Sequence, residues 1–143
     1  METQELHRGR LIDHIQLVVK DFEASRRFYK AVFAALEIPV GAEEKDFIWA
    51  DELFISTADS EAAAGKLTGR HHLAFQAADP AMVDAFYAAG IKAGGVDNGK
   101  PGERTKYHPG YYAAFLLDPD GNNIEAVFHG KANRSAPSVK ITF

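Results

Sequence analysis

The chain has 143 residues, of which 46% are hydrophobic, and its 16 basic and 20 acidic residues leave a net charge of −4. This is the length of one ordinary domain with a substantial core. The absence of cysteine excludes a disulfide scaffold, a thiolate zinc site and a cysteine nucleophile, and it suits a reducing compartment, so we expect a cytoplasmic protein. The mild acidity and the lack of a long apolar run argue against nucleic acid or a membrane as partners.

The chain contains an internal repeat. The segment DHIQLVVKD at 13–21 aligns with HHLAFQAAD at 71–79, an offset of 58 residues, and the Phe-Tyr pair at 28–29 falls on a second Phe-Tyr pair at 86–87. The later halves of the two copies correspond more loosely. Two related modules therefore make up the chain.

The elements of the first module follow from local patterns. Residues 12–19 alternate in polarity and are rich in β-branched side chains, which predicts a strand. Asp21 is placed to cap a helix over residues 22–36, where apolar side chains recur at helical spacing. Short strands that end in a hairpin are expected after the helix.

The second module repeats this order with stronger signals. Asp79 caps its helix, Pro80 takes the first helical position, and Gly90 follows the last apolar residues, which predicts that the helix ends there. The sequence DPDGNN at 118–123 predicts the turn of the final hairpin.

Each module is thus predicted to be β-α-β-β-β, which places the chain in the α+β class as a single domain. Module 1 spans about 10–58, a polar connector rich in alanine and glycine spans 58–70, and module 2 spans about 71–130. Residues 1–9 and 131–143 are expected to be polar tails, the second with a short strand near its end.

Three side chains suggest a metal site. On a strand, alternate side chains share a face, so His14 lies with Gln16, and His72 lies with Ala74. Glu125 lies in the apolar strand IEAVF, where a carboxylate is costly unless it is paired or bound to a cation. Two imidazoles and one carboxylate suit zinc with an open position or the facial triad of ferrous iron. Taken singly, each residue is more often structural, and only the symmetry of the repeat couples them.

These residues, together with DPDGNNIE at 118–125, resemble the vicinal oxygen chelate superfamily over residues 10–130. That superfamily includes glyoxalase I, extradiol dioxygenases, fosfomycin-resistance enzymes, methylmalonyl-CoA epimerase and bleomycin-resistance proteins. The resemblance implies a glyoxalase-like fold in which the two modules form a cupped mixed β-sheet around one divalent metal. It assigns His14, His72 and Glu125 as the ligands, and the metal as zinc, nickel, manganese or iron.

The sequence departs from the glyoxalase I pattern at one position. A fourth ligand, a glutamate on the last strand of module 1, is missing from LFISTA at 53–58, and Glu52 precedes that strand in the expected turn. The three-ligand set is closer to that of the dioxygenases and fosfomycin-resistance enzymes. A glyoxalase-like reaction then requires Glu125 to act alone as the catalytic base.

The segment KPGERTKYHPGYY at 100–112 is predicted to be a long loop between strands of module 2. Long loops rich in such side chains are often binding loops. Arg104 and Lys106 are candidates to bind an anionic group, and Tyr107, His108 and Tyr111 to line the binding site or donate a proton. A solvated loop with one packed tyrosine is the equal alternative. His129 is expected at the surface.

We therefore expect a metal-dependent lyase or isomerase that acts on a small molecule with adjacent oxygens, with Glu125 catalytic. Ring cleavage by an extradiol-type dioxygenase and thiol transfer of the fosfomycin-resistance type are the enzymatic alternatives. A metal-free protein that sequesters a small molecule, as bleomycin-resistance proteins do, is the alternative of another class. The resemblance also implies a homodimer, in which one chain or two could close the cup.

Overall fold

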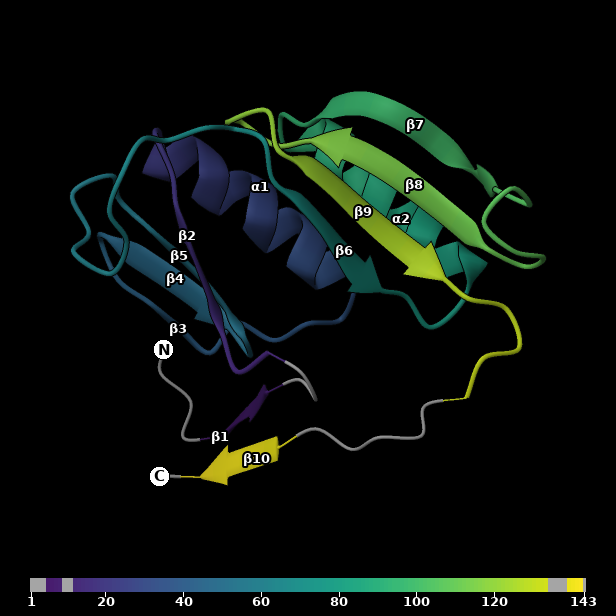
Figure 1. The fold of residues 1–143 in the computed structure, drawn as a ribbon, viewed down its shortest axis with the longest axis horizontal. Helices are drawn as coiled ribbons and strands as arrows, with labels where there is room; N and C mark the ends of the chain where they lie inside the picture. Colours follow the sequence, from purple (N-terminus) through teal and green to yellow (C-terminus); the bar gives the residue numbers. More distant parts are fainter. Residues whose placement is uncertain (1–4, 9–11, 134–138, 143) are drawn as a thin grey trace.

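The computed structural model describes residues 5–8, 12–133 and 139–142 (Figure 1). The order β-α-β-β-β occurs twice, and it confirms the predicted α+β class and the paired modules. In chain order the elements are β1 (Glu5–Arg8), β2 (Ile15–Val18), α1 (Phe22–Ala35), β3 (Ala42–Glu43), β4 (Phe47–Ala50), β5 (Leu53–Ser56), β6 (His72–Gln76), α2 (Pro80–Lys92), β7 (Val96–Glu103), β8 (Tyr112–Leu117), β9 (Asn123–Phe128) and β10 (Val139–Thr142).

The two modules have the same strand order. The first forms a four-stranded sheet in the order β2-β5-β4-β3, and the second forms one in the order β6-β9-β8-β7. In each, the first strand pairs in parallel with the last strand, and the remaining pairs are antiparallel. No strand pair joins the two sheets in the described residues, so each module contributes its own mixed sheet to the predicted glyoxalase-like arrangement.

The helices cover one face of each sheet and contact one another, so the main apolar core spans both modules, and a smaller cluster around Ala42 and Trp49 lies apart from it. Phe33 of α1 packs edge to face on Phe75 of β6, with ring centroids 6.0 Å apart. Along β6, Leu73 and Phe75 pack against this core, whereas His72 and the alternate residues after it are exposed. This alternation leaves the second face of the sheet uncovered by helix.

Both helices begin as predicted. The Asp21 side chain accepts a hydrogen bond from the Ala24 amide, and the Asp79 side chain accepts one from the Met82 amide at the start of α2. These bonds satisfy amides that have no partner within the first turn.

The end of α2 differs from the prediction, because the helix continues past Gly90 to Lys92. Gly90 is buried, and a Cβ atom there would lie 2.2 Å from Cδ1 of Leu116 on β8. This glycine is therefore required for close packing of α2 on the sheet. The left-handed conformation typical of a helix end occurs at Gly94, with φ of 99°.

A buried polar network joins the modules at the DPDGNN turn. The Tyr29 hydroxyl, on α1, donates to Oδ2 of Asp118 at 2.5 Å. Oδ1 of Asp118 accepts the amides of Asp120 and Asn122, at 2.9 and 2.8 Å, and Oδ2 accepts the Asn122 side-chain amide. Burial, followed by the charge of Asp118 and the bond to it, raises the pKa of Tyr29 well above its ordinary value. The turn is thus held by the other module.

Two segments of the chain are more ordered than predicted. The expected N-terminal tail contains β1, which pairs antiparallel with β10, so the predicted terminal strand is confirmed as β10, with Phe143 outside the described residues (Figure 1). The loop expected at 100–112 is shorter, because β7 continues to Glu103. It does so through two shifts in register against β8, at Gly99 and Gly102.

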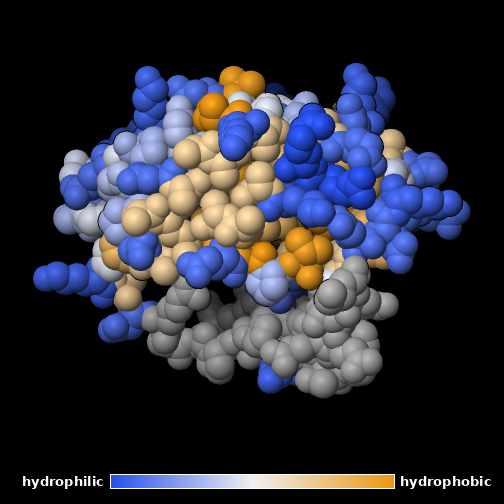
Figure 2. Space-filling model, turned by 180° about the vertical axis from the view of Figure 1, so that it is seen from behind, coloured by the Kyte–Doolittle hydropathy of each residue, from blue (hydrophilic) through white to orange (hydrophobic). Residues whose placement is uncertain are grey.

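The back of the molecule has a weakly hydrophobic area in its middle, flanked by hydrophilic side chains (Figure 2). Helix α2, which lies behind the second sheet in Figure 1, exposes Ala81, Ala85 and Ala88. None of the helices in the described ranges has the length and apolar character needed to span a bilayer.

Candidate functional site

The candidate site lies on the uncovered face of the second sheet. The register pairs Ala74 of β6 with Glu125 of β9, and Glu125 with Phe115 of β8. His72 lies two residues before Ala74 on the same face, as the period of two in the strand predicted. An imidazole, a carboxylate and an aromatic ring therefore lie close together.

Two of the three predicted ligands are in contact. Nε2 of His72 lies 3.0 Å from Oε2 of Glu125, whose side chain is 3% exposed. Nδ1 of His72 lies 3.0 Å from the carbonyl oxygen of Asn123. Because a carbonyl only accepts, Nδ1 carries the proton, and in the neutral ring the lone pair of Nε2 faces the carboxylate. A proton or a metal cation between Nε2 and Oε2 is needed to make this contact favourable.

Tyr111 binds the other oxygen of the same carboxylate. Its hydroxyl donates to Oε1 of Glu125. Burial, together with the bond to Glu125 and its charge, raises the pKa of Tyr111 well above its ordinary value. The hydroxyl is therefore a proton donor across the physiological range, and the two oxygens of Glu125 have different partners.

The Tyr111 ring is part of an aromatic cluster, formed by Tyr107, His108, Tyr111 and His129. The Tyr111 ring centroid lies 4.8 Å from that of Tyr107 and 5.3 Å from those of His108 and His129. Nδ1 of His108 donates to the Pro109 carbonyl oxygen at 2.9 Å, which leaves Nε2 to accept from Nδ1 of His129 at 3.0 Å. His129, expected at the surface, is therefore part of this cluster.

The Arg104 side chain is hydrogen-bonded to the backbone around it. Its guanidinium donates to the carbonyl oxygens of Lys100, Gly102 and Ala113 and lies 5.3 Å from the ring centroid of Phe115. Three of its five N–H groups are thus used to hold the β7–β8 connection, and two are left to bind an anion. The Lys106 ammonium lies over the Tyr107 ring, 5.1 Å from its centroid.

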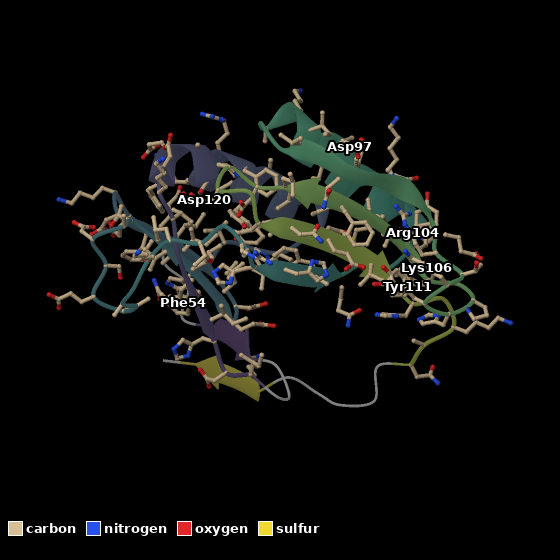
Figure 3. The ribbon with its side chains drawn as sticks, turned by 45° about the horizontal axis from the view of Figure 1, so that its top comes forward. Phe54, Asp97, Arg104, Lys106, Tyr111 and Asp120 are labelled. Atoms are coloured by element: carbon tan, nitrogen blue, oxygen red, sulfur yellow. The ribbon has the colours of Figure 1, made fainter. Side chains whose placement is uncertain are left out.

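The third predicted ligand lies elsewhere in the chain. His14 directly precedes β2, and its Nδ1 is 2.7 Å from a carboxylate oxygen of Asp13. Its ring packs edge to face on Phe54 of β5, which in turn stacks on Trp49. Phe54 and the group of Arg104, Lys106 and Tyr111 lie toward opposite sides of the molecule (Figure 3). Within the described ranges no three metal-binding side chains converge.

A cavity of about 270 Å³ lies beneath the connector, between β2 and the DPDGNN turn. Residues 63–69 and His71 contribute to its wall, with Gln16 and Asp120. Burial raises the pKa of Asp120, although its carboxylate accepts the Lys20 amide. No sequence motif marked this cavity, because its walls come from three distant segments.

The family model described as the glyoxalase/bleomycin resistance protein/dioxygenase superfamily matches residues 11–126. The chain belongs to this superfamily. The matched range covers nearly all of both modules and includes all three predicted ligands, so the resemblance inferred from His14, His72 and DPDGNNIE is confirmed at the level of the family. A comparison with curated proteins gives no match.

Several solved structures share this fold. A glyoxalase/bleomycin resistance protein from Albidiferax ferrireducens T118 is 32% identical, with a TM-score of 0.66 over 82% of this chain and 98% of its own. A glyoxalase-related enzyme from Fulvimarina pelagi is 22% identical, with a TM-score of 0.65 over 94% and 99% of the two chains. Lactoylglutathione lyase from Agrobacterium tumefaciens is 19% identical, with a TM-score of 0.61 over 84% and 94%. The last two likenesses support the fold alone.

Proposed function

We propose that this superfamily member is a metal-dependent, glyoxalase-like lyase or isomerase acting on a small molecule with adjacent oxygens. The observation that carries the proposal is the contact between Nε2 of His72 and Oε2 of Glu125 on an uncovered sheet face. The Asn123 carbonyl orients the imidazole in the way that metal-binding histidines are commonly held.

This pair fits a divalent metal as two of its ligands, and His14 is the proposed third. When bound, such a metal polarises two neighbouring substrate oxygens and stabilises the negative charge that forms on them. Glu125 is the proposed base that takes a proton from one carbon and returns it to the next.

His14 reaches the pair either by rearrangement within the chain or from a second copy of it. We propose the homodimer, in which His14 of one copy completes the pair in the other. Mixing His14→Ala with Glu125→Gln protein tests this arrangement. Statistical exchange of subunits restores about one quarter of the sites if the ligands come from two copies, and none if they come from one.

The substrate is proposed to lie against Phe115, between His72 and Arg104. The two remaining N–H groups of Arg104 suit an anionic group, and Tyr107, His108 and Tyr111 border the same end of the sheet.

Metal content and product formation test the function together. Protein purified without chelators is analysed for bound metal and heated with zinc, nickel, manganese or iron. At 100 times Kd a specific metal stabilises by about 2.7 kcal/mol, or roughly 9 °C for a chain of this size. Each loaded form is then assayed on methylglyoxal–thiol adducts, catechols and fosfomycin. The proposal predicts isomerisation of an adduct, with activity lost in Glu125→Gln.

A metal-free binding protein is the second candidate, and the separation of His14 from the His72–Glu125 pair favours it. It predicts no thermal shift with any of the four metals and no turnover. Turnover of catechols with iron, or of fosfomycin, would instead identify the dioxygenase or transferase alternative.

A further inference from the structure

We infer that Tyr111 is a positioning residue for Glu125, held by the aromatic cluster, and that it directs one carboxylate oxygen to His72. This inference rests on the proposed role of the His72–Glu125 pair. Tyr111 acts through Glu125 and not on the substrate itself.

The first step is that the two oxygens of the Glu125 carboxylate have different partners. Oε1 of Glu125 accepts from the Tyr111 hydroxyl and Oε2 faces Nε2 of His72. Rotation about the last side-chain bond of glutamate is otherwise broad, so nothing intrinsic to Glu125 holds one of its oxygens toward His72. The bond from Tyr111 fixes this rotation.

The second step is the fixation of Tyr111 itself. Tyr111 lies at the end of the loop between β7 and β8, directly before β8. The rings of His108 and His129 both pack edge to face on it. These two imidazoles are hydrogen-bonded to one another, and His108 is also hydrogen-bonded to the Pro109 carbonyl oxygen. The loop is thereby tied to the end of β9, the strand that carries Glu125.

The third step is the effect of Tyr111 on the contact between His72 and Glu125. With Tyr111 in place, Oε2 is presented to the position that a cation shared with His72 would occupy. Loss of a bond to a metal-binding carboxylate commonly lowers metal affinity by about 10- to 100-fold. Loss of the Tyr111 hydroxyl is expected to affect His72 in the metal-free protein as well, because the Glu125 carboxylate is then free to rotate away from Nε2 of His72.

The test compares Tyr111→Phe with Tyr112→Phe. Tyr112 is the adjacent residue, and its hydroxyl also donates to a carboxylate, that of Asp84 at 2.8 Å, so it is a matched control. The imidazole nitrogen NMR signals of His72 are recorded at a single pH in the metal-free proteins. Zn²⁺ and Mn²⁺ affinities are then measured by calorimetry.

We expect Tyr111→Phe to move the His72 signals and to lower metal affinity about 10- to 100-fold, and Tyr112→Phe to do neither. In a Glu125→Ala background, which removes the acceptor of the Tyr111 hydroxyl, Tyr111→Phe should add no change to the His72 signals. Unchanged His72 signals in Tyr111→Phe, or an added change in the Glu125→Ala background, would overturn the inference. If the wild-type protein binds no metal while the His72 signals still move, the proposed function fails and the inference stands.

Discussion

Replacement of Tyr29 by Phe removes the hydroxyl that connects α1 of module 1 to the DPDGNN turn of module 2. Tyr29 is fully buried, and Asp118, which accepts its hydrogen bond at 2.5 Å, is 4% exposed. The ring is retained, so neither a cavity nor a change in apolar burial accompanies the substitution. The loss is therefore confined to one hydrogen bond on a buried carboxylate.

A hydrogen bond to a charged group contributes about 1.5–3 kcal/mol. Asp118 retains its bonds to Asp120 and Asn122, so the cost should stay within this range and not reach that of an unpaired buried charge. The entropy of unfolding for a chain of this size is about 300 cal/mol/K, which converts the loss into a fall in Tm of about 5–10 °C.

Urea unfolding followed by two probes measures the loss of stability in Tyr29→Phe and shows whether it affects one module or both. Trp49, the only tryptophan of the chain, reports on module 1, and far-ultraviolet circular dichroism reports on both modules. We expect both transitions to move together, because one core spans the two modules. A loss below about 0.5 kcal/mol, or two separate transitions in the wild-type protein, would refute the reasoning.

Three further predictions concern stability. Gly90→Ala should destabilise the protein by about 1–2 kcal/mol, because the added Cβ overlaps the buried Leu116 side chain. The better helix propensity of alanine offsets only part of this cost. A higher urea midpoint for the variant would contradict this packing role. Asp79→Ala removes the cap of α2 and should cost about 1 kcal/mol in the same assay, and no loss would argue against the cap. The raised pKa of Tyr29 means that above about pH 10 the unfolded chain releases a proton that the folded chain retains, so the free energy of unfolding falls as pH rises. Tyr29→Phe should remove that part of the alkaline loss, and equal slopes for the two proteins would contradict it.

Local signals and the repeat predicted most of the fold. The match of 13–21 with 71–79 indicated two modules, and the capping residues placed both helix starts, since a cap acts within one turn. The end of α2 was predicted at Gly90 because a glycine near the last apolar residue is typical of a helix end. Its actual role depends on Leu116, which lies on another strand and is invisible to local patterns.

The candidate site was only partly predictable for the same reason. The period of two placed His72 and Glu125 on one face, and adjacent strands in register then bring them together. His14 directly precedes β2, the first strand of the other sheet, and the distance between the two sheets is a property of tertiary packing. The contacts of Tyr111 with Glu125 and of His108 with His129 depend on the path of the loop after Glu103.

The most direct test of the proposed metal site is a calorimetric titration of Zn²⁺ into His72→Ala and His71→Ala protein. The two residues are adjacent, and His71 is exposed and contributes to the separate cavity beneath the connector. We predict about one Zn²⁺ per chain in the wild type and in His71→Ala, and an affinity at least about 10-fold lower in His72→Ala. Equal affinities in the two variants, or no binding to the wild type, would contradict the site.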